Sequence, residues 1–436
     1  MRVLDWQTLT PAERQAALQR PALRHASEVE AGARRIVAAV RHGADEALRE
    51  LTLRFDGVRL GSIAVEAGEF AAAERALDDR QHAAIDTAIG NVRRFHAAQA
   101  QAPLVLETAP GVLCERLCVP IGAVGLYVPA GSAPLPSTAI MLAVPATIAG
   151  CPVRVICTPA RPDGAVDPAV LVAARRAGVE RVYKIGGAQA VAAMAYGTPT
   201  VPKCDKIFGP GNAWVAAAKL LVAADPDGAA ADLPAGVSEV LVVADDSARA
   251  DFVAADLLAQ AEHGADAQAL LVTDSAALAA AVAAEIERQR RTLSRGAILA
   301  ESIAHMRAIV VESLGAALEL ANRYAPEHLL LEVREPRSWL GRVRNAGAVF
   351  LGPWSPESVG DYCAGPNHTL PTYGYARSCS GLGLEDFQKR ITVQQLSPAG
   401  LRALGDATRT LAALEGLDAH AAAVSIRLAA LAESGS

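Results

Sequence analysis

The segment Arg323 to Glu332 brings an acid and a base together at one point of the chain. Glu327 and His328 are adjacent, directly after Pro326, and Leu329 to Leu331 begin an apolar run typical of a buried strand. A carboxyl and an imidazole have different reference pKa values, so such a pair can exchange protons near neutral pH. Neighbouring side chains of a regular strand point to opposite faces, so both can serve one site only if the chain turns at Pro326. By itself the segment favours a plainer interpretation, a surface glutamate and a half-buried histidine at the end of a loop.

The segment Gln260-Ala-Glu-His263-Gly offers a second pair of polar side chains. Residues at positions i and i+3 of a helix lie on the same face, so Gln260 and His263 could share a metal ion. A helix that ends in His-Gly is also an ordinary helix end, because histidine is favoured near the negative end of the helix dipole. Taken alone, this segment favours the helix end over the metal site.

Two further acid and histidine pairs lie toward the C-terminus. Asp361 and His368 occupy a segment stiffened by glycine and proline, and Glu415 and His420 lie in a helical tail. An aspartate in such a loop often only caps a turn, and charged residues of a tail are often solvated. Four of the nine histidines nevertheless have a carboxylate close by in a segment marked by glycine or proline: His263, His328, His368 and His420. Together they could form a nitrogen and oxygen site for Zn²⁺ or Mn²⁺ without any cysteine.

No GxGxxG fingerprint for a dinucleotide follows an expected strand. The segment Gly209-Pro-Gly-Asn212 opens a helix after a short strand, so its backbone amides could receive a phosphate. A purely structural turn explains the same residues at least as well. A dinucleotide bound by this chain would therefore not use the usual loop.

The elements that must position these residues alternate between strand and helix. A first block predicts strands at 112–120, 123–128, 153–158, 181–185 and 206–208, with helices at 167–177, 189–196 and 213–224. A second block predicts strands at 239–244, 269–273, 308–311, 328–333 and 348–351, with helices at 251–262, 276–290 and 314–324. Alternation of this kind is typical of parallel sheets covered by helices, so we expect two α/β lobes with a cleft between them. Residues 27–101 and the tail from 397 are expected to be helical, 1–25 to form an N-terminal arm, and 129–138 and 352–383 to be loops.

Composition excludes several classes of protein. The 436 residues carry a net charge of −6, which argues against binding to nucleic acid or to an anionic membrane surface. We expect neither a signal peptide nor a membrane span, since Met1 to Arg20 lacks an apolar core and the longest apolar run is cut by proline and arginine. The seven cysteines are odd in number, scattered and free of CxxC pairs, so a reducing cytoplasm is expected.

Long motifs make the chain resemble the histidinol dehydrogenase family over nearly its whole length. They are Gly125-Leu-Tyr-Val-Pro-Ala-Gly-Ser-Ala-Pro-Leu-Pro-Ser-Thr, Lys184-Ile-Gly-Gly-Ala-Gln-Ala, Ile207-Phe-Gly-Pro-Gly-Asn, Pro234-Ala-Gly-Val-Ser-Glu, Gln260-Ala-Glu-His, Tyr324-Ala-Pro-Glu-His-Leu, and Gly360-Asp-Tyr through Asp386-Phe-Gln-Lys-Arg. The resemblance implies an α/β fold of two incomplete Rossmann-like lobes in an intertwined homodimer. Its expected parts are an N-terminal arm at 1–25, a first lobe at 26–126 and 239–380, a second lobe at 127–238, and a C-terminal helical extension at 381–436 that completes the partner's site.

The resemblance also implies roles for residues. The zinc ligands, one ion per subunit, match Gln260, His263, Asp361 and His420, and the proton-transfer pair matches Glu327 and His328. Substrate contacts match Ser238, His328, His368 and Glu415 as well as the four metal ligands. Positions associated with NAD match Tyr127, Gln189 and Asn212.

The implied reaction is the four-electron oxidation of L-histidinol to L-histidine through L-histidinaldehyde, the last two steps of histidine biosynthesis. Each of two NAD⁺ molecules accepts one hydride. In the family His328 would be the base, Glu327 would activate water for the second step, and zinc would hold the nitrogens of the substrate. The alternatives are a dehydrogenase of another small alcohol, such as a sulfonated diol, on the same scaffold; a binding protein without activity; and a zinc hydrolase, which the absence of HExxH disfavours.

Overall fold

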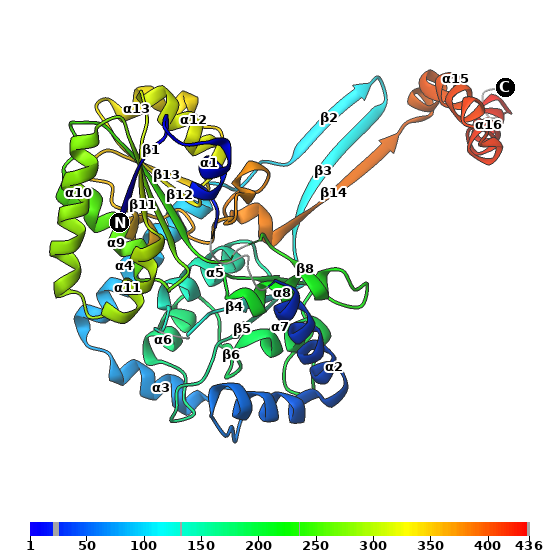
Figure 1. Cartoon of the computed structure of the whole chain (residues 1–436). Helices are drawn as coiled ribbons and strands as arrows, with labels where there is room; N and C mark the ends of the chain where they lie inside the picture. The colour runs from blue at the N-terminus through cyan, green and yellow to red at the C-terminus, as the bar shows by residue number, and fades with distance from the viewer. Residues whose placement is uncertain (21–25, 131–132, 235, 434–436) are drawn as a thin grey trace. The chain divides into compact units, whose positions relative to one another are not determined.

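The computed structural model describes residues 1–20, 26–130, 133–234 and 236–433 (Figure 1). They form two compact units, the first made of Met1–Gln99 and Ile121–Phe387 and the second of Ala100–Pro120 and Gln388–Ser436. Both parallel sheets belong to the first unit, which confirms the expected α/β class. None of the helices in the described ranges combines the length and the apolar character that crossing a membrane requires.

The larger sheet has six strands in the order β1-β11-β10-β9-β12-β13, and every pair is parallel. The strands are β1 (Arg2–Asp5), β9 (Glu239–Ala244), β10 (Gln268–Thr273), β11 (Arg307–Val310), β12 (His328–Glu332) and β13 (Ala348–Leu351). All but β1 follow the expected pattern within a residue or two. The N-terminal arm therefore contributes an edge strand, and its helix α1 (Pro11–Ala17) follows directly.

Successive side chains of a strand point to opposite faces of the sheet, so alternate residues pack into two separate hydrophobic cores. On one face Val240 and Val242 of β9 pack with α9 (Ala250–Ala261), α10 (Ala276–Gln289) and α11 (Gly296–His305). On the other face Leu241 and Val243 pack with α12 (Leu314–Tyr324). Burial on both faces explains why these strands read as unbroken apolar runs.

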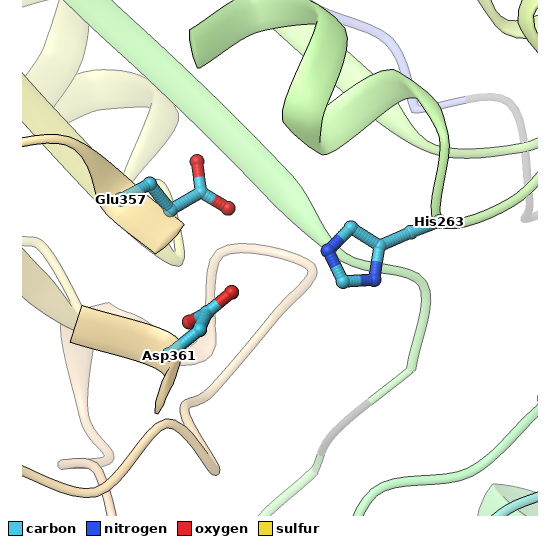
Figure 2. Close-up of side chains that lie close together, drawn as sticks. All are labelled: His263, Glu357 and Asp361. Carbon is cyan, nitrogen blue, oxygen red and sulfur yellow. The ribbon is translucent and has the colours of Figure 1, made fainter. Parts of the chain in front are cut away.

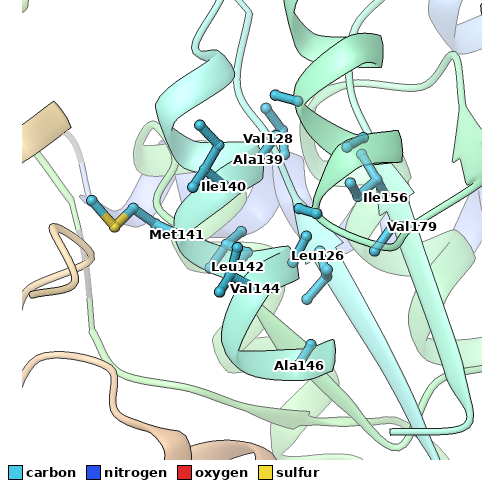
Figure 3. Close-up of a cluster of buried hydrophobic side chains, with 14 of the residues drawn as sticks. Leu126, Val128, Ala139, Ile140, Met141, Leu142, Val144, Ala146, Ile156 and Val179 are labelled. Atoms are coloured by element: carbon cyan, nitrogen blue, oxygen red, sulfur yellow. The ribbon is translucent and has the colours of Figure 1, made fainter. Parts of the chain in front are cut away.

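The smaller parallel sheet has the order β6-β5-β4-β7-β8. Its strands are β4 (Ala123–Tyr127), β5 (Val153–Cys157), β6 (Arg181–Tyr183), β7 (Lys206–Phe208) and β8 (Ala230–Ala231). Leu126 and Ile156 face α5 (Pro136–Ile148) and α6 (Pro168–Arg176), in the core that Figure 3 shows. Tyr127 and Val155 face the other way, toward α7 (Gly187–Tyr196) and α8 (Ala213–Ala223).

The N-terminal helices pack against the helices that cover this smaller sheet. They are α2 (Ala26–Asp56), α3 (Ala67–Ala76) and α4 (Asp79–Ala97). Helix α2 contacts α7 and α8, α3 contacts α6, and α4 contacts α5. The structure differs here from the expected domain boundaries, which assigned residues 26–126 to the same lobe as residues 239–380. Sequence periodicity shows that a helix is amphipathic but not which sheet its apolar face will meet.

The second unit is an antiparallel sheet in the order β14-β3-β2 followed by two helices. Its elements are β2 (Leu104–Ala109), β3 (Val112–Pro120), β14 (Gln388–Leu396), α15 (Pro398–Leu414) and α16 (Asp418–Glu433). The expected helical extension at 381–436 therefore contains a nine-residue strand before its two helices. The break between the two tail helices falls at Gly416, as expected, where φ is +70°.

Two segments that were expected to be loops contain helices. Helix α5 begins at Pro136, inside the expected loop at 129–138, of which residues 131–132 lie outside the described ranges. Helix α14 (Glu357–Tyr362) lies inside the expected loop at 352–383. Short helical turns also join some of the elements, such as α13 (Pro336–Trp339).

Candidate active site

The acid and base pair stands where α12 gives way to β12. Helix α12 ends on Ala325, whose left-handed φ of +55° turns the chain, so the turn lies one residue before Pro326. Pairing with β9 and β13 begins only at His328, which makes Glu327 the last residue before the regular strand. The rule that neighbouring side chains of a strand point to opposite faces therefore does not apply to this pair. The side chains of Glu327 and His328 lie close to each other on the same side of the chain.

One residue, Glu239, holds both side chains through its backbone. Its N–H donates a hydrogen bond to Glu327 Oε2 at 2.7 Å, and its carbonyl accepts one from His328 Nδ1 at 3.1 Å. Glu327 Oε2 and His328 Nδ1 are themselves 3.6 Å apart, and both residues are buried. Because Nδ1 carries the hydrogen, Nε2 is the atom of a neutral His328 that can accept a proton. Within the described residues the buried Nε2 has no hydrogen-bond partner.

Two carboxylates of helix α14 complete a cluster around this imidazole. Glu357 Oε1 lies 3.6 Å from His328 Nδ1, and Asp361 Oδ1 lies 3.6 Å from His328 Nε2. Residues four apart share a face of a helix, which explains how both carboxylates reach one histidine. Sequence reasoning missed Glu357. The spacing of Glu357 and Asp361 would have pointed to it if the segment had been recognised as a helix.

Burial and charge shift the proton affinities of this cluster. Burial raises the pKa of Glu327 and of Glu357 to about 8, against the opposing charge of His328. Burial alone would lower the pKa of His328, but the charges of Glu357, Glu327 and Asp361 outweigh it and raise that pKa well above its usual value. For Asp361, burial would raise the pKa, but the charge of the nearby His328 outweighs it, so that pKa falls. The pKa values of the Glu327 and Glu357 carboxyls thus lie near neutral pH, where a group can hold and release a proton.

Ligand atoms for a metal ion meet beside the same cluster. His263, Glu357 and Asp361 each offer one ligand atom within 4.8 Å of the others (Figure 2). Gln260 is fully buried, and neither atom of its side-chain amide has a hydrogen-bond partner among the described residues. A buried amide without a partner costs free energy unless something binds it, so these donors fit a divalent cation. His263 follows Glu262, the C-cap residue of α9, which confirms the helix-end interpretation. Its role as a metal ligand stays a prediction.

The expected substrate contacts divide between the two units. His368 is half-buried, with Nδ1 at 3.0 Å from the carbonyl of Asp361 and Nε2 at 3.3 Å from the hydroxyl of Thr138. Ser238 is half-buried and directly precedes Glu239. Glu415 and His420 belong to the second unit and are exposed there, at the junction of α15 and α16. Their part in the site stays a prediction.

The expected cofactor positions lie at the carboxyl edge of the smaller sheet. The hydroxyl of Tyr127, at the end of β4, accepts a hydrogen bond from Gly187 N at 3.0 Å, and burial raises the pKa of Tyr127 to about 12. Gln189 is buried in the same first turn of α7. Asn212 is exposed and caps α8, with Oδ1 accepting from the N–H groups of Trp214 and Val215.

The turn at Gly209 is a structural one. Its N–H donates to Asp232 Oδ2 at 2.8 Å, its carbonyl accepts from Lys219 Nζ at 3.0 Å, and its φ is +117°. A Cβ on this residue would lie 2.2 Å from the carbonyl oxygen of Tyr127, so only glycine fits. The Gly209 N–H is therefore already bonded and is not free to receive a phosphate.

Comparisons with known proteins all point the same way. The family model described as histidinol dehydrogenase matches residues 18–428. The chain is 54% identical to histidinol dehydrogenase of Xanthomonas oryzae pv. oryzae over 428 residues, covering 98% of this chain and 99% of that protein. It is 49% identical to the Vibrio cholerae protein of the same name, covering 98% of each. The crystal structure of histidinol dehydrogenase from Elizabethkingia anophelis superposes with a TM-score of 0.94 at 41% identity, covering 99% of this chain and 98% of that one.

Proposed function

The chain belongs to the histidinol dehydrogenase family, and we infer that it oxidises L-histidinol through L-histidinaldehyde to L-histidine with two molecules of NAD⁺. This reaction forms the last two steps of histidine biosynthesis. The observation that carries the proposal is the cluster of Glu327, His328 and Asp361 beside His263 and an unpartnered Gln260.

The acid and base pair has a separate task in each oxidation. A hydride leaves an alcohol more readily as its proton departs, and the neutral form of His328 takes that proton at Nε2. The aldehyde must then add water before a second hydride can leave, and the Glu327 carboxylate takes a proton from that water. Glu239 keeps both groups in place, because its backbone binds the Glu327 carboxylate and the Nδ1–H of His328. NAD⁺ supplies the hydride acceptor in both steps.

We further propose zinc as the metal, one ion per subunit, with Gln260, His263, Asp361 and His420 as its ligands. Nitrogen and oxygen donors of this kind suit zinc. The bound ion would hold the imidazole and amino nitrogens of the substrate, so it would position the reacting carbon. The close approach of Glu357 to His263 and Asp361 makes this carboxylate a further donor of the same set. We also propose Ser238, His368 and Glu415 for the substrate, Tyr127, Gln189 and Asn212 for NAD, and the cytoplasm as the location.

One assay tests the activity. The purified protein with L-histidinol and excess NAD⁺ is expected to produce about two NADH per histidine, because two hydrides leave one carbon. No NADH, or NADH only with a sulfonated diol, would contradict the proposal.

We propose a homodimer in which the tail of each chain completes the partner's site. The second unit exposes large apolar side chains, which supports burial against another copy: Leu104, Val105 and Leu106 on β2, Leu411 and Leu414 on α15, and Ile426 on α16. Glu415 and His420 lie in this unit, so the tail would carry both residues into the site of the partner chain.

Mixing two inactive variants tests the shared site. A heterodimer of His420→Ala and Glu327→Ala chains has one site with both native residues and one with neither. Random mixing is therefore expected to restore about a quarter of the wild-type activity, because half of the dimers are mixed and half of their sites are intact. If the mixture stays as inactive as each parent although the chains exchange, each site is built from one chain.

A further inference from the structure

The side chain of Glu239 points away from the two residues that its backbone holds. Its carboxylate is 2% exposed and receives two hydrogen bonds from Arg20, Nε to Oε1 at 2.5 Å and Nη2 to Oε2 at 2.8 Å. The N–H of Tyr373 donates a third, to Oε1 at 2.8 Å. A buried carboxylate without such partners would be driven toward water or toward protonation. Arg20 therefore keeps Glu239 in the conformation that presents its backbone to Glu327 and His328.

Arg20 also contacts the other chain segment that leads to the pair. Its guanidinium lies over the ring of Tyr324, 4.0 Å from the centroid, and Nη2 donates to the carbonyl of Tyr324 at 3.0 Å. Tyr324 is the last residue of α12, immediately before the left-handed Ala325 and three residues before Glu327. One side chain thus joins the start of β9 to the end of α12, the two segments that meet at the acid and base.

We propose that Arg20 is a positioning residue for the oxidation of histidinol, acting through Glu239 on Glu327 and His328. The inference rests on the proposed function and adds a residue to it. Arg20 comes from the N-terminal arm, outside all the motifs that carry the family resemblance.

Loss of the guanidinium has a specific consequence. The Glu239 carboxylate would be buried with only the Tyr373 N–H, and residue 239 would shift to reach water. Its carbonyl would then release the Nδ1–H of His328, and its N–H would release the Glu327 carboxylate. A displacement of about 1 Å at a reacting group is enough to lower a rate about 100-fold.

Arg20→Met tests the proposal, with Arg14→Met as its matched control. Arg14 lies in the same arm, is half-buried, stacks on Trp6 and donates to a backbone carbonyl, but it does not touch Glu239. We expect Arg20→Met to lower kcat about 10- to 100-fold, with KM for NAD⁺ and bound zinc per chain near the wild-type values. Arg14→Met is expected to keep kcat. Equal kcat values in the two variants would overturn the proposal.

A second variant separates positioning from a general loss of stability. Arg20→Met/Glu239→Gln removes both charges of the pair, and the glutamine keeps an acceptor for Tyr373 N. Neutral replacement of both partners of a buried pair is often tolerated, whereas removal of one is not. We expect kcat of the double variant within about tenfold of wild type and above that of Arg20→Met. This variant also decides the matter if Arg20→Met fails to fold, because a folded double variant with kcat below that range would contradict the proposal.

Wild-type protein in the same assay distinguishes failure of the proposed activity from failure of the proposed role of Arg20. If wild type does not turn over histidinol, the proposed function fails. If wild type is active and Arg20→Met is equally active, only the role of Arg20 fails.

Discussion

Glu327 Oε2 and His328 Nδ1 lie 3.6 Å apart, and the backbone of a third residue, Glu239, binds both. Adjacent residues of one chain thus face one site although a strand begins between them. The arrangement separates two tasks, because the Glu327 carboxylate is oriented through an N–H and the His328 ring through a carbonyl. Each task can be removed on its own.

Glu327→Gln is expected to stop the reaction between its two oxidations. Glutamine keeps an acceptor for the N–H of Glu239 but cannot take a proton from water, so histidine formation should fall about 10²- to 10⁴-fold. Single-turnover measurements should then find about one NADH per histidinol, together with free or hydrated aldehyde. His328→Gln is the comparison, since loss of the base should slow the first oxidation as well. Histidine and two NADH at the wild-type rate from Glu327→Gln would rule out its role in activating water.

His263→Ala is expected to weaken zinc binding by at least about tenfold, as measured by metal analysis after dialysis. His42→Ala is the control, because His42 is exposed on α2 and bonds only a carbonyl of its own helix. Glu357→Gln tests whether Glu357 is itself a ligand of the metal, since Glu357 and His263 belong to the same group of potential ligands. Zinc retained by Glu357→Gln and lost by Gln260→Leu would assign the ion to the ligands expected from the family. The reverse outcome would assign it to Glu357.

Asn212→Ser is expected to raise KM for NAD⁺ about tenfold while the protein remains as stable as wild type. Serine caps a helix nearly as well as asparagine, so the bonds to the N–H groups of Trp214 and Val215 are replaced, but the side-chain NH₂ is lost. Asn212→Ala removes the cap as well and should cost about 1 kcal/mol of unfolding free energy. An unchanged KM for NAD⁺ in both variants would limit Asn212 to capping.

The buried pair Asp256 and Glu332 is expected to make the protein less stable as pH rises. Burial raises the pKa of each to about 7, and Asp256 adds to the shift of Glu332. Their contribution is complete below the unfolded-state pKa values near 4 and is lost as pH rises through about 7. Asp256→Asn should flatten this slope and, at pH 8, raise the unfolding free energy by on the order of 2 kcal/mol.

Denaturant unfolding between pH 5 and 8 measures that effect, with the exposed Glu50→Gln as control. A slope that Asp256→Asn leaves unchanged would mean that Asp256 remains charged in the folded protein.

The sheets were largely predictable because their strands are buried on both faces. Runs such as Val240 to Ala244 and Leu329 to Leu331 are apolar throughout and buried, and helical periods separate them. The elements that were missed lack this signal. Strand β14 is mostly exposed, β1 is a short edge strand in a polar arm, and α14 is six residues long, too short to show a period.

The sequence by itself determined the family, the α/β class and the residues that could do chemistry, since long motifs and residue types persist without a structure. It left open where those residues meet. Glu327 and His328 share a site only because the left-handed Ala325 turns the chain before pairing begins, and Glu357 joins them only because α14 is a helix. The tertiary structure also sets the pair at the amino ends of β9 and β12, whereas Tyr127 and Asn212 lie at the carboxyl edge of the other sheet. The reason is physical: hydrogen bonds from Glu239 to residues 88 and 89 positions away, and from Arg20 to a residue 219 positions away, exist only once the segments are packed.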